Sequence, residues 1–385
     1  MAAEKRLYAK EDRFRAKQVD IPFLILVLLL LTVGLTMLYS ASFAQSQYDT
    51  HYEISTKYLQ KQAVCALLGL FCLWIFSRIP AEFWLKFAWP VYGISIVLLL
   101  LVLVAGESVN GARRWINIAG IQFQPSEIAK FAMILLLARL TKRFGTDAGK
   151  FRYGVLGFGC AMLGLLVPLA LEKHLSAIML MGLVGVVMMF VAGTGKKWLA
   201  AGAAAALGFV LIYITFMGYA GDRVTAWLHP EADPSDTGYQ ILQSLYAIGS
   251  GGLFGLGLGK SRQKYLYLPF QYNDYIFAII CEELGLAGAL LIILLFALTI
   301  SRGYWVALRA RDRFSTVFAA GLVTLIAVQT VLNLCVVTNL LPSTGIALPF
   351  FSYGGTALAV NLGEMGILLS ISRYRNEPKI QEELI

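Results

Sequence analysis

Long apolar runs, separated by short polar stretches, dominate this sequence. Each run has about 20 residues, the length that an α-helix needs to cross the roughly 30 Å hydrocarbon core of a bilayer. Backbone N–H and C=O groups find no water inside a bilayer, so such runs fold as helices that satisfy these groups internally. The sequence therefore predicts an all-α integral membrane protein, a polytopic bundle of transmembrane helices with one large extracytoplasmic loop.

About ten runs are predicted to span the membrane. Hydrophobic residues make up 58% of the chain and charged residues 14%, whereas a soluble domain carries roughly 25% charged residues. Because no repeat, low-complexity tract or soluble domain interrupts the runs, residues 1–385 are predicted to form a single membrane domain. The first run is too long for a signal peptide and is expected to remain as a span. The predicted spans are residues 21–43, 58–78, 84–105, 121–140, 153–171, 175–193, 198–218, 274–300, 314–337 and 355–372.

The distribution of basic residues predicts the orientation. Most of the 32 lysine and arginine residues lie in the leader (1–20), in alternate loops and in the tail (373–385). By the positive-inside rule, both termini are then cytoplasmic and the protein crosses a bacterial cytoplasmic membrane. The net charge of +9 is accounted for by this cytoplasmic face, so nucleic acid is not expected as a partner.

The extracytoplasmic side then has one large loop, 219–273, and two shorter ones, 106–120 and 339–354. A site on that side must be built from these three loops. The five cysteines lie in apolar segments without a CxxC pair, and the three histidines are scattered. Neither a disulfide framework nor a zinc site is therefore predicted.

The fourth run begins with two charged residues, Glu127 and Lys130. Their i, i+3 spacing places them on one face of a helix, where they can pair. The pair could simply neutralise itself so that the helix can cross the membrane. Alternatively, it shapes a polar cavity that opens outward, with Lys130 facing an anionic headgroup.

Two arginines, Arg113 and Arg114, lie on the predicted outer side, against the positive-inside trend, and Trp115 follows them. Arginine binds phosphate in a bidentate manner and tryptophan prefers the headgroup layer, so the trio fits a lipid with a phosphate head. The alternative is an interfacial anchor for a short re-entrant loop.

The large loop contains a glycine run, 249–259, followed by Lys260 and Ser261. A P-loop is excluded because Phe254 stands where its spacing requires glycine. Lys260, Arg262 and Lys264 form an external basic cluster that is either a solvated loop or a contact for a pyrophosphate or lipid headgroup. Segment 238–248 has helical apolar spacing and is predicted to lie along the membrane surface.

The eighth run opens with Asp274, near the positive end of the predicted helix dipole, which favours the carboxylate. Asp274 is either a simple helix N-terminal charge or a general base or cation ligand. Glu282 and Glu283 are expected about 12 Å further along the same helix, pointing apart so that they cannot share a partner. We interpret them, with Asn333 and Glu364, as structural polar residues in the membrane.

Together these stretches resemble the SEDS family, the FtsW/RodA/SpoVE polytopic proteins of bacterial division, elongation and sporulation. The resemblance runs from the first span to Arg373, with the motifs in the family's order. It is carried by Asn110-Gly-Ala-Arg-Arg-Trp-Ile116, Gln124-Pro-Ser-Glu-Ile-Ala-Lys130, Gly238-Tyr-Gln-Ile-Leu-Gln-Ser244, the glycine run 249–259, Asp274-Tyr-Ile-Phe-Ala278, Glu282-Glu-Leu-Gly285 and Leu348-Pro-Phe-Phe-Ser-Tyr-Gly-Gly355.

The resemblance implies a peptidoglycan glycosyltransferase that polymerises lipid II at the outer membrane face, in cell division or cell-shape maintenance. It implies that Asp274 is essential and that Arg114 and Trp115 belong to the substrate site. It also implies a class B penicillin-binding protein as partner, within a division or elongation complex. A divalent cation, Mg²⁺ or Mn²⁺, could assist, although the sequence shows no dedicated metal cage. We assign substrate binding to Arg113, Arg114, Trp115, Glu127, Lys130, Gln240, Gln243, Ser244, Lys260, Arg262 and Ser352.

The sequence departs from the family pattern in two places. The family usually has Pro-Glu-x-His-Thr-Asp where this chain has Pro269-Phe-Gln-Tyr-Asn-Asp274, which weakens any mechanism with a second acid beside Asp274. The family often shows Gln-Pro-Asp-Leu-Gly-Thr where Leu171-Glu-Lys-His-Leu-Ser176 stands, closer to the FtsW/SpoVE branch. Two other functions remain open: a lipid-precursor flippase that uses the buried charges, and a non-catalytic scaffold for a penicillin-binding protein.

Overall fold

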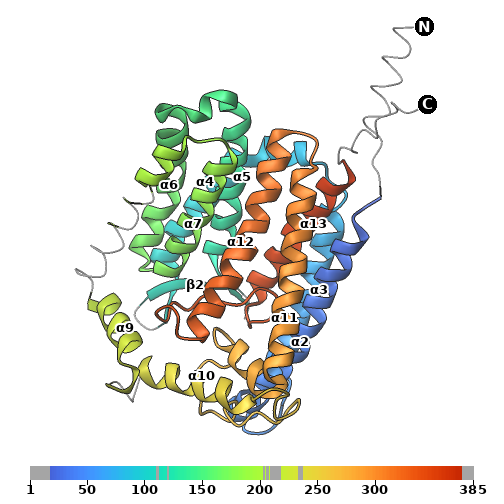
Figure 1. The fold of residues 1–385 in the computed structure, drawn as a ribbon, viewed down its shortest axis with the longest axis vertical. Coiled ribbons are helices and arrows are strands. Elements are labelled where there is room, and N and C mark those ends of the chain that lie inside the picture. The colour runs from blue at the N-terminus through green and yellow to red at the C-terminus, as the bar shows by residue number, and fades with distance from the viewer. Residues whose placement is uncertain are drawn as a thin grey trace.

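The computed structural model describes residues 18–109, 112–118, 121–202, 204, 208, 218–232 and 237–374. Nearly all of the described elements are helices, and the longest of them run side by side through a bundle (Figure 1). Most of the basic leader, the tail beyond residue 374 and much of the predicted span 198–218 lie outside the described residues.

Each predicted span, apart from 198–218, overlaps a helix, although several bounds differ. Seven stretches of the described residues are long and apolar enough to cross a membrane: 21–49, 57–76, 81–105, 151–171, 276–308, 313–337 and 355–373. α7 is apolar but shorter, and α5 carries the charged pair Glu127 and Lys130. The bundle helices are α2 (Ile21–Asp49), α3 (Lys57–Phe76), α4 (Ala81–Ala105), α5 (Pro125–Phe144), α6 (Phe158–Leu171), α7 (Leu175–Val191), α11 (Ile276–Leu308), α12 (Arg313–Val337) and α13 (Gly355–Arg373), with η2 (Gly145–Gly149) and η3 (Phe151–Gly157) before α6.

The two ends of the bundle differ. At one end, which we call the terminal face, the chain enters α2 and leaves α13 (Figure 1). Here Arg302 of α11 holds Asp20, the N-cap of α2, through two hydrogen bonds of 3.0 and 2.9 Å. The opposite end, the loop face, carries β1 to β3, α9, α10 and the segments 252–275 and 338–354. The three loops from which an outer site was predicted therefore all contribute to the loop face.

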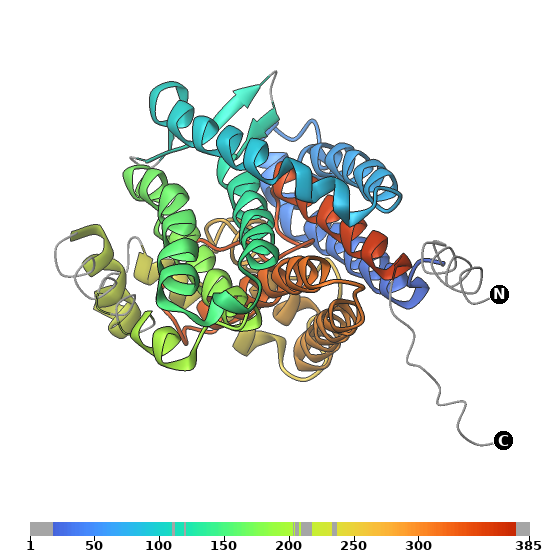
Figure 2. The ribbon, with the colours of Figure 1, turned by 90° about the horizontal axis from the view of Figure 1, so that it is seen from above.

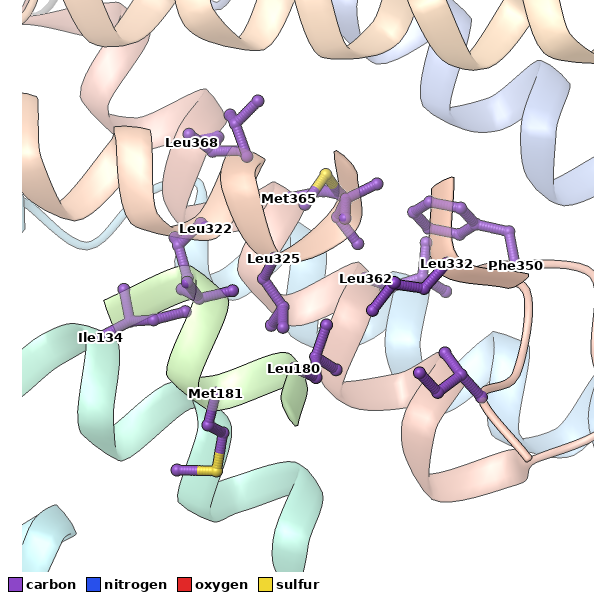
Figure 3. Close-up of a cluster of buried hydrophobic side chains, with 14 of the residues drawn as sticks. Ile134, Leu180, Met181, Leu322, Leu325, Leu332, Phe350, Leu362, Met365 and Leu368 are labelled. Carbon is purple, nitrogen blue, oxygen red and sulfur yellow. The ribbon is translucent and has the colours of Figure 1, made fainter. Parts of the chain in front are cut away.

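α12 lies in the middle of the bundle and contacts α5, α7, α11 and α13 (Figure 2). Apolar side chains from these helices meet around it, including Leu322, Leu325, Met181 and Met365 (Figure 3). Helices at the rim, such as α3 and α4, leave most of their apolar residues at least partly exposed. That exposure is expected for a chain surrounded by lipid, where burial gives no hydrophobic driving force between helices.

A small antiparallel sheet replaces the re-entrant loop that was considered for residues 106–120. Its strands β1 (Glu107–Val109), β2 (Ala112–Ile118) and β3 (Ile121–Phe123) are ordered β1-β2-β3, and Trp115 pairs with Glu107 across β1 and β2. The predicted fourth span consequently begins later than residue 121. Pro125 starts α5 because proline lacks only an N–H that the first helical turn leaves unbonded.

α9 (Gly218–Leu228), η4 (Pro230–Ala232) and α10 (Thr237–Gly251) follow one another along the loop face. α10 crosses this face at a steep angle to the bundle helices (Figure 1). The helical spacing of residues 238–248 thus correctly predicted a helix, and its expected position along the membrane surface stays a prediction.

α11 is broken at Gly285, contrary to the expectation of one continuous helix. Gly285 adopts φ of 68°, a conformation that glycine takes without the penalty of a Cβ. The loop after α10 forms backbone hydrogen bonds with α11 on both sides of the break, in place of bonds within the helix. Leu286 N donates to Gly252 O (2.9 Å), Ala287 N to Leu253 O (3.0 Å), Leu256 N to Glu282 O (2.9 Å) and Gly257 N to Glu283 O (3.0 Å).

This exchange explains the glycine run 249–259. A Cβ on Gly255 would lie 2.2 Å from Glu283 O, and a Cβ on Gly285 would lie 2.3 Å from Gly255 N. Only two glycines allow the loop and the helix backbone to approach this closely. The glycine run therefore allows the loop to form hydrogen bonds at the break in α11. The spacing of the glycines in the sequence did not predict this structural role.

Candidate active site on the loop face

The segment that leads into α11 is fixed through three consecutive backbone carbonyls. Each carbonyl accepts one hydrogen bond from α12 or from the segment between α12 and α13. The segment therefore has little freedom to shift along its own axis. The bonds run from Tyr353 N to Tyr272 O (2.9 Å), from Ser352 Oγ to Asn273 O (2.7 Å) and from Asn333 Nδ2 to Asp274 O (2.7 Å).

Asn333 is fully buried near the loop-face end of α12. Its amide also donates to Ile346 O at 2.7 Å, so one side chain joins the two loops that meet at Asp274. One turn earlier on α12, Gln329 Nε2 donates to Ala347 O at 2.9 Å. Asn333 was interpreted as a structural polar residue, and the structure shows its role: its amide positions the backbone of Asp274.

The carboxyl group of Asp274 lies beside Gly345, where a Cβ would come within 3.2 Å of Oδ2. Asp274 is half-buried, and burial raises its pKa from 3.8 to about 6, an effect that Arg223 partly offsets. The expected stabilisation of the carboxylate by a helix dipole is therefore outweighed. The helix begins only at Ile276, which leaves Asp274 outside its first turn.

Arg223 was not among the predicted site residues. It stands in α9, and its Nη1 donates to Ser343 O at 2.8 Å, which brings its charge near Asp274. A clue existed in the sequence, because Arg223 is an arginine on the predicted outer side, like Arg113 and Arg114. Its proximity to Asp274 depends on how α9 folds across the loop face.

A chain of contacts joins β2 to Asp274. Arg114 Nη2 donates to Lys173 O at 2.5 Å, in the connection between α6 and α7. Three residues further, Ser176 Oγ donates to Thr344 O, whose neighbour Gly345 lies against the Asp274 carboxyl group. Arg114, predicted from the sequence as a phosphate contact, is thus brought to the same region of the loop face as Asp274.

The connection between α6 and α7 adds two titratable groups that were not among the predicted site residues. Burial raises the pKa of Glu172 to about 8, although Arg114 acts in the opposite direction. Burial, Arg114 and Lys130 together lower the pKa of His174 to about 3. Both side chains are therefore mainly neutral at pH 7, and both lie close to Arg114.

A buried polar cluster lies on α5 and α13. Lys130 Nζ and Glu127 Oε2 form the predicted i, i+3 ion pair at 2.7 Å, and both side chains are buried. Glu364 of α13 lies within electrostatic reach of both. Within the described residues, several buried polar atoms of this cluster and of the connection between α6 and α7 have no hydrogen-bond partner, namely Ser126 Oγ, Glu172 Oε1, His174 Nδ1, Asn361 Oδ1 and both Glu364 carboxyl oxygens. Because buried polar groups are normally bonded, this interior is suited to a polar ligand.

The other predicted residues of the outer loops are placed differently. Arg113 is exposed and its Nη1 donates to Leu103 O at 3.1 Å, while Trp115 is half-buried on β2. Gln240 Nε2 donates to Pro269 O (3.2 Å) and Ser244 Oγ to Val337 O (2.9 Å), which fastens α10 to the loop face. Gln243 is half-buried on the same helix. Gln240 and Ser244 thus serve the scaffold in this structure, as does Ser352.

Glu282 and Glu283 fasten the loop after α10, as their structural interpretation predicted. Glu282 accepts hydrogen bonds from Arg262 N (3.0 Å) and Ser261 Oγ, whereas Glu283 pairs with Lys264 Nζ at 2.9 Å. The expectation that the two glutamates cannot share a partner was wrong, because Ser261 N also donates to Glu283 at 3.3 Å. A loop residue can direct its amide and its hydroxyl to different acceptors.

The predicted external basic cluster is split by this arrangement. Lys264 points inward to Glu283 and is buried, whereas Lys260 and Arg262 are exposed. Lys260 and Arg262 line a separate cavity with Ser261, Gln263, Tyr265 and Tyr267. The structure does not bring this pair to Asp274.

A dedicated metal cage is not found on the described part of the chain, where no three His, Cys, Asp or Glu side chains converge. Asp274 offers a single carboxylate beside the cation Arg223. The described residues around Asp274 therefore do not form a divalent-cation site by themselves.

Comparisons with known proteins agree with this architecture. Residues 21–377 match the FtsW/RodA/SpoVE model, described as a cell cycle protein. The chain is 37% identical to a probable peptidoglycan glycosyltransferase FtsW of Trichlorobacter lovleyi, across 93% of this chain and 94% of that protein. It is 39% identical to the stage V sporulation protein E of Bacillus subtilis, across 92% and 97% of the two chains.

Solved structures show the same fold. A chain from a peptidoglycan synthase complex, described as coordinating polymerization and crosslinking, superposes with a TM-score of 0.77 at 28% identity, covering 92% of this chain and 98% of that one. The rod shape determining protein RodA of Thermus thermophilus gives a TM-score of 0.69 at 27% identity, covering 94% and 98%. The match along nearly the whole chain and the shared helical fold establish that this multi-pass membrane protein belongs to the FtsW/RodA/SpoVE family of cell cycle proteins.

Proposed function

We propose that this protein is a peptidoglycan glycosyltransferase that polymerises lipid II in cell division or cell-shape maintenance, with Asp274 as the general base. The observation that carries the proposal is the carboxyl group of Asp274 on the loop face, whose backbone is fixed by hydrogen bonds to three consecutive carbonyls, those of Tyr272, Asn273 and Asp274. Relatives named as peptidoglycan glycosyltransferases support the reaction class.

The orientation follows from charge. Arg302, Arg309, Arg311 and Arg313 surround the terminal-face connection between α11 and α12. By the positive-inside rule this face is cytoplasmic, together with both termini, and the loop face is external. Nucleotide donors are not supplied there, so the donor sugar must carry its own leaving group, as a polyprenyl pyrophosphate does.

The chemistry assigned to Asp274 is proton removal. Its carboxylate takes the proton of the acceptor sugar's 4-hydroxyl while that oxygen bonds to the anomeric carbon of the donor. The bond from the anomeric carbon to the pyrophosphate oxygen breaks, and the lipid pyrophosphate leaves with the electron pair. A base with a pKa of about 6 is mostly deprotonated at pH 7 yet still a useful proton acceptor.

The departing pyrophosphate needs positive charge. Arg114, linked to the Asp274 region through the connection between α6 and α7, is our first candidate, with Arg113 and Trp115 on the same strand. Arginine binds such groups in a bidentate manner and stabilises the charge that develops as the bond breaks. Arg223 has the second role of keeping Asp274 ionised between turnovers.

The polar cluster of Lys130, Glu127 and Glu364 would hold polar parts of the substrate below the loop face. Its unpaired buried atoms support this assignment. The class B penicillin-binding protein implied by the sequence resemblance is proposed as a partner, in keeping with the fold shared with a chain of a peptidoglycan synthase complex.

The test uses the purified full chain with lipid II, with and without a class B penicillin-binding protein. Wild type should yield glycan polymer, and Asp274→Asn should yield none while keeping the same melting temperature or higher. Asp147→Asn, which changes an exposed aspartate on the terminal face, is the control and should stay active. Polymer from Asp274→Asn would remove Asp274 from the mechanism.

A flippase is the second candidate, favoured by the buried cluster of Glu127, Lys130 and Glu364. Charges buried in a bundle often line translocation paths. Movement of lipid II across vesicles should then be lost in Glu364→Gln and retained in Asp274→Asn. If the protein is a glycosyltransferase, Asp274→Asn should reduce polymerisation more than Glu364→Gln does.

A further inference from the structure

The loop between α10 and α11, residues 252–275, presents two cations that the mechanism does not use. Lys260 and Arg262 are exposed, while their neighbour Lys264 is neutralised by Glu283. Among the salt bridges of the described residues, none engages Lys260 or Arg262. The two side chains are therefore available to an anion that arrives from outside the protein.

These cations line a cavity of about 480 Å³. Its other walls include two tyrosines, Tyr265 and Tyr267, both more than half exposed. The volume lies within the range of roughly 300–1,000 Å³ that is typical of small-molecule sites. Cationic and aromatic walls together suit a ligand that has an anionic head and an apolar body.

Backbone hydrogen bonds join this loop to α11 at the point where that helix becomes exposed. Its residues Gly252 and Leu253 accept from Leu286 and Ala287, the first residues of α11 after the break. From that point α11 exposes a series of apolar side chains, among them Leu286, Leu290 and Leu291, as a lipid-facing helix does. The cavity therefore belongs to a loop that is anchored where a lipid-facing span ends.

The loop itself exposes large apolar side chains close to the cavity in the sequence. Phe254 is 82% exposed, and Leu253 and Leu258 are also mostly exposed. Such residues are costly in water but favourable in the headgroup and acyl boundary of a membrane, where tyrosines also concentrate. A surface that combines them with two cations matches the outer layer of a bilayer that contains anionic lipid.

We propose that Lys260, Arg262, Tyr265 and Tyr267 form a binding site for the phosphate headgroup of an anionic phospholipid from the surrounding leaflet. The guanidinium of Arg262 and the ammonium of Lys260 bind the phosphate, and the two tyrosines contact the glycerol and upper acyl region. Leu253, Phe254 and Leu258 insert beside it.

The site is ready-made, because Glu282 and Glu283 hold the loop through buried hydrogen bonds to Arg262 N and Ser261 N. Pre-ordering of this kind reduces the conformational entropy that binding must otherwise remove. The site is also separate from Asp274. Asp274 is not among the residues that line the cavity, and the loop is bound through Glu282 and Glu283, which lie eight and nine residues further along the chain than Asp274.

Lipid binding can be measured on the purified full chain. The protein would be titrated with vesicles of phosphatidylcholine containing fluorescent phosphatidylglycerol, and binding read from energy transfer. The double variant Lys260→Gln, Arg262→Gln should lower the affinity for phosphatidylglycerol by about 30-fold, the effect expected from two cations at an anionic surface. Affinity for fluorescent phosphatidylcholine should not change.

Lys61→Gln is the matched control, because Lys61 is also an exposed lysine, at the loop-face end of α3. This variant should bind phosphatidylglycerol like wild type. An excess of inorganic phosphate should compete only weakly if the site takes a lipid, and strong competition would assign it to free phosphate instead. Unchanged binding by the double variant, or equal loss in the control, would overturn the proposal.

A second measurement uses wild-type protein only, so that no variant's folding affects the result. Wild-type protein would be illuminated with photoactivatable phosphatidylglycerol and the attached residues mapped by mass spectrometry. Crosslinks should concentrate in residues 253–267 and decrease when salt is raised. Crosslinks elsewhere would refute the site. Protection of residues 253–267 by a penicillin-binding protein, with no lipid crosslinks there in its absence, would mark the surface as a protein interface.

Discussion

The hydrogen bond from Asn333 to the backbone of Asp274 allows a sharp test of the site. In Asn333→Ala, two buried carbonyl groups, Asp274 O and Ile346 O, lose donors that lie at 2.7 Å. An unsatisfied buried acceptor costs about 1–3 kcal/mol. If the free-energy cost at Asp274 O misplaces the carboxylate in the transition state, and so raises the activation free energy by a similar amount, kcat falls by roughly 10- to 100-fold.

The assay is polymerisation of lipid II by the full chain, at a temperature where both proteins remain folded. The expected signature is a fall in kcat with little change in KM, because Asn333 positions the base and does not contact substrate. Combining Asn333→Ala with Asp274→Asn should lose no more activity than Asp274→Asn alone, since both changes disable the same group.

Gln329→Ala provides the matched control. Gln329 lies one turn earlier on α12 and donates to Ala347 O at 2.9 Å, so its loss also leaves an acceptor of the same loop unbonded. It does not bond to the segment that carries Asp274. Similar falls in kcat for Gln329→Ala and Asn333→Ala would show that the loop as a whole, and not the hydrogen bond to Asp274, sets the rate. Wild-type kcat in Asn333→Ala would refute the reasoning altogether.

Four further predictions can be checked with purified protein. The polymerisation rate should fall tenfold per pH unit below about 6, because the general base must be ionised; a flat profile from pH 5 to 8 would contradict this assignment. A raised folded-state pKa means that wild type loses stability as pH rises through about 6, so Asp274→Asn should melt higher than wild type at pH 8 and nearly equally at pH 4. Gly285→Ala should lower the melting temperature severely because its Cβ would meet the loop backbone, whereas Gly182→Ala, which meets nothing within 4 Å, should be neutral. Glu283→Gln should destabilise by about 3–5 kcal/mol by leaving Lys264 buried and unpaired, and adding Lys264→Met should restore most of that loss in a denaturation experiment.

The membrane class and most helices could be predicted from the sequence alone, because lipid leaves a chain few choices. An apolar run of sufficient length must satisfy its own backbone, so length and hydropathy determine each span. The same local reasoning identified the Lys130–Glu127 pair, since both residues lie within one helical turn. Asp274 was found as a carboxylate at the start of an apolar run, together with the family motif around it.

The packing of the helices against one another could not be predicted from the sequence in the same way. In lipid, the outward and inward faces of a helix are equally apolar, so periodicity does not tell which side meets α12. The break at Gly285 was hidden for a related reason. Its hydrogen bonds come from Gly252, Leu253, Leu256 and Gly257, which no local pattern links to α11.

Part of the candidate site could be predicted from the sequence, and the rest required the tertiary structure. Sequence selected Asp274, Arg114, Lys130 and Asn333 as residue types that are costly in or beside a membrane and therefore need a purpose. Only the tertiary structure showed that Asn333 positions Asp274 and that Arg223 lies close to it. It also showed that Lys264 turns inward while Lys260 and Arg262 remain exposed. These relations join segments that are distant in the chain, and a contact between distant segments is decided by how the whole bundle packs, whereas a span is decided by its own residues.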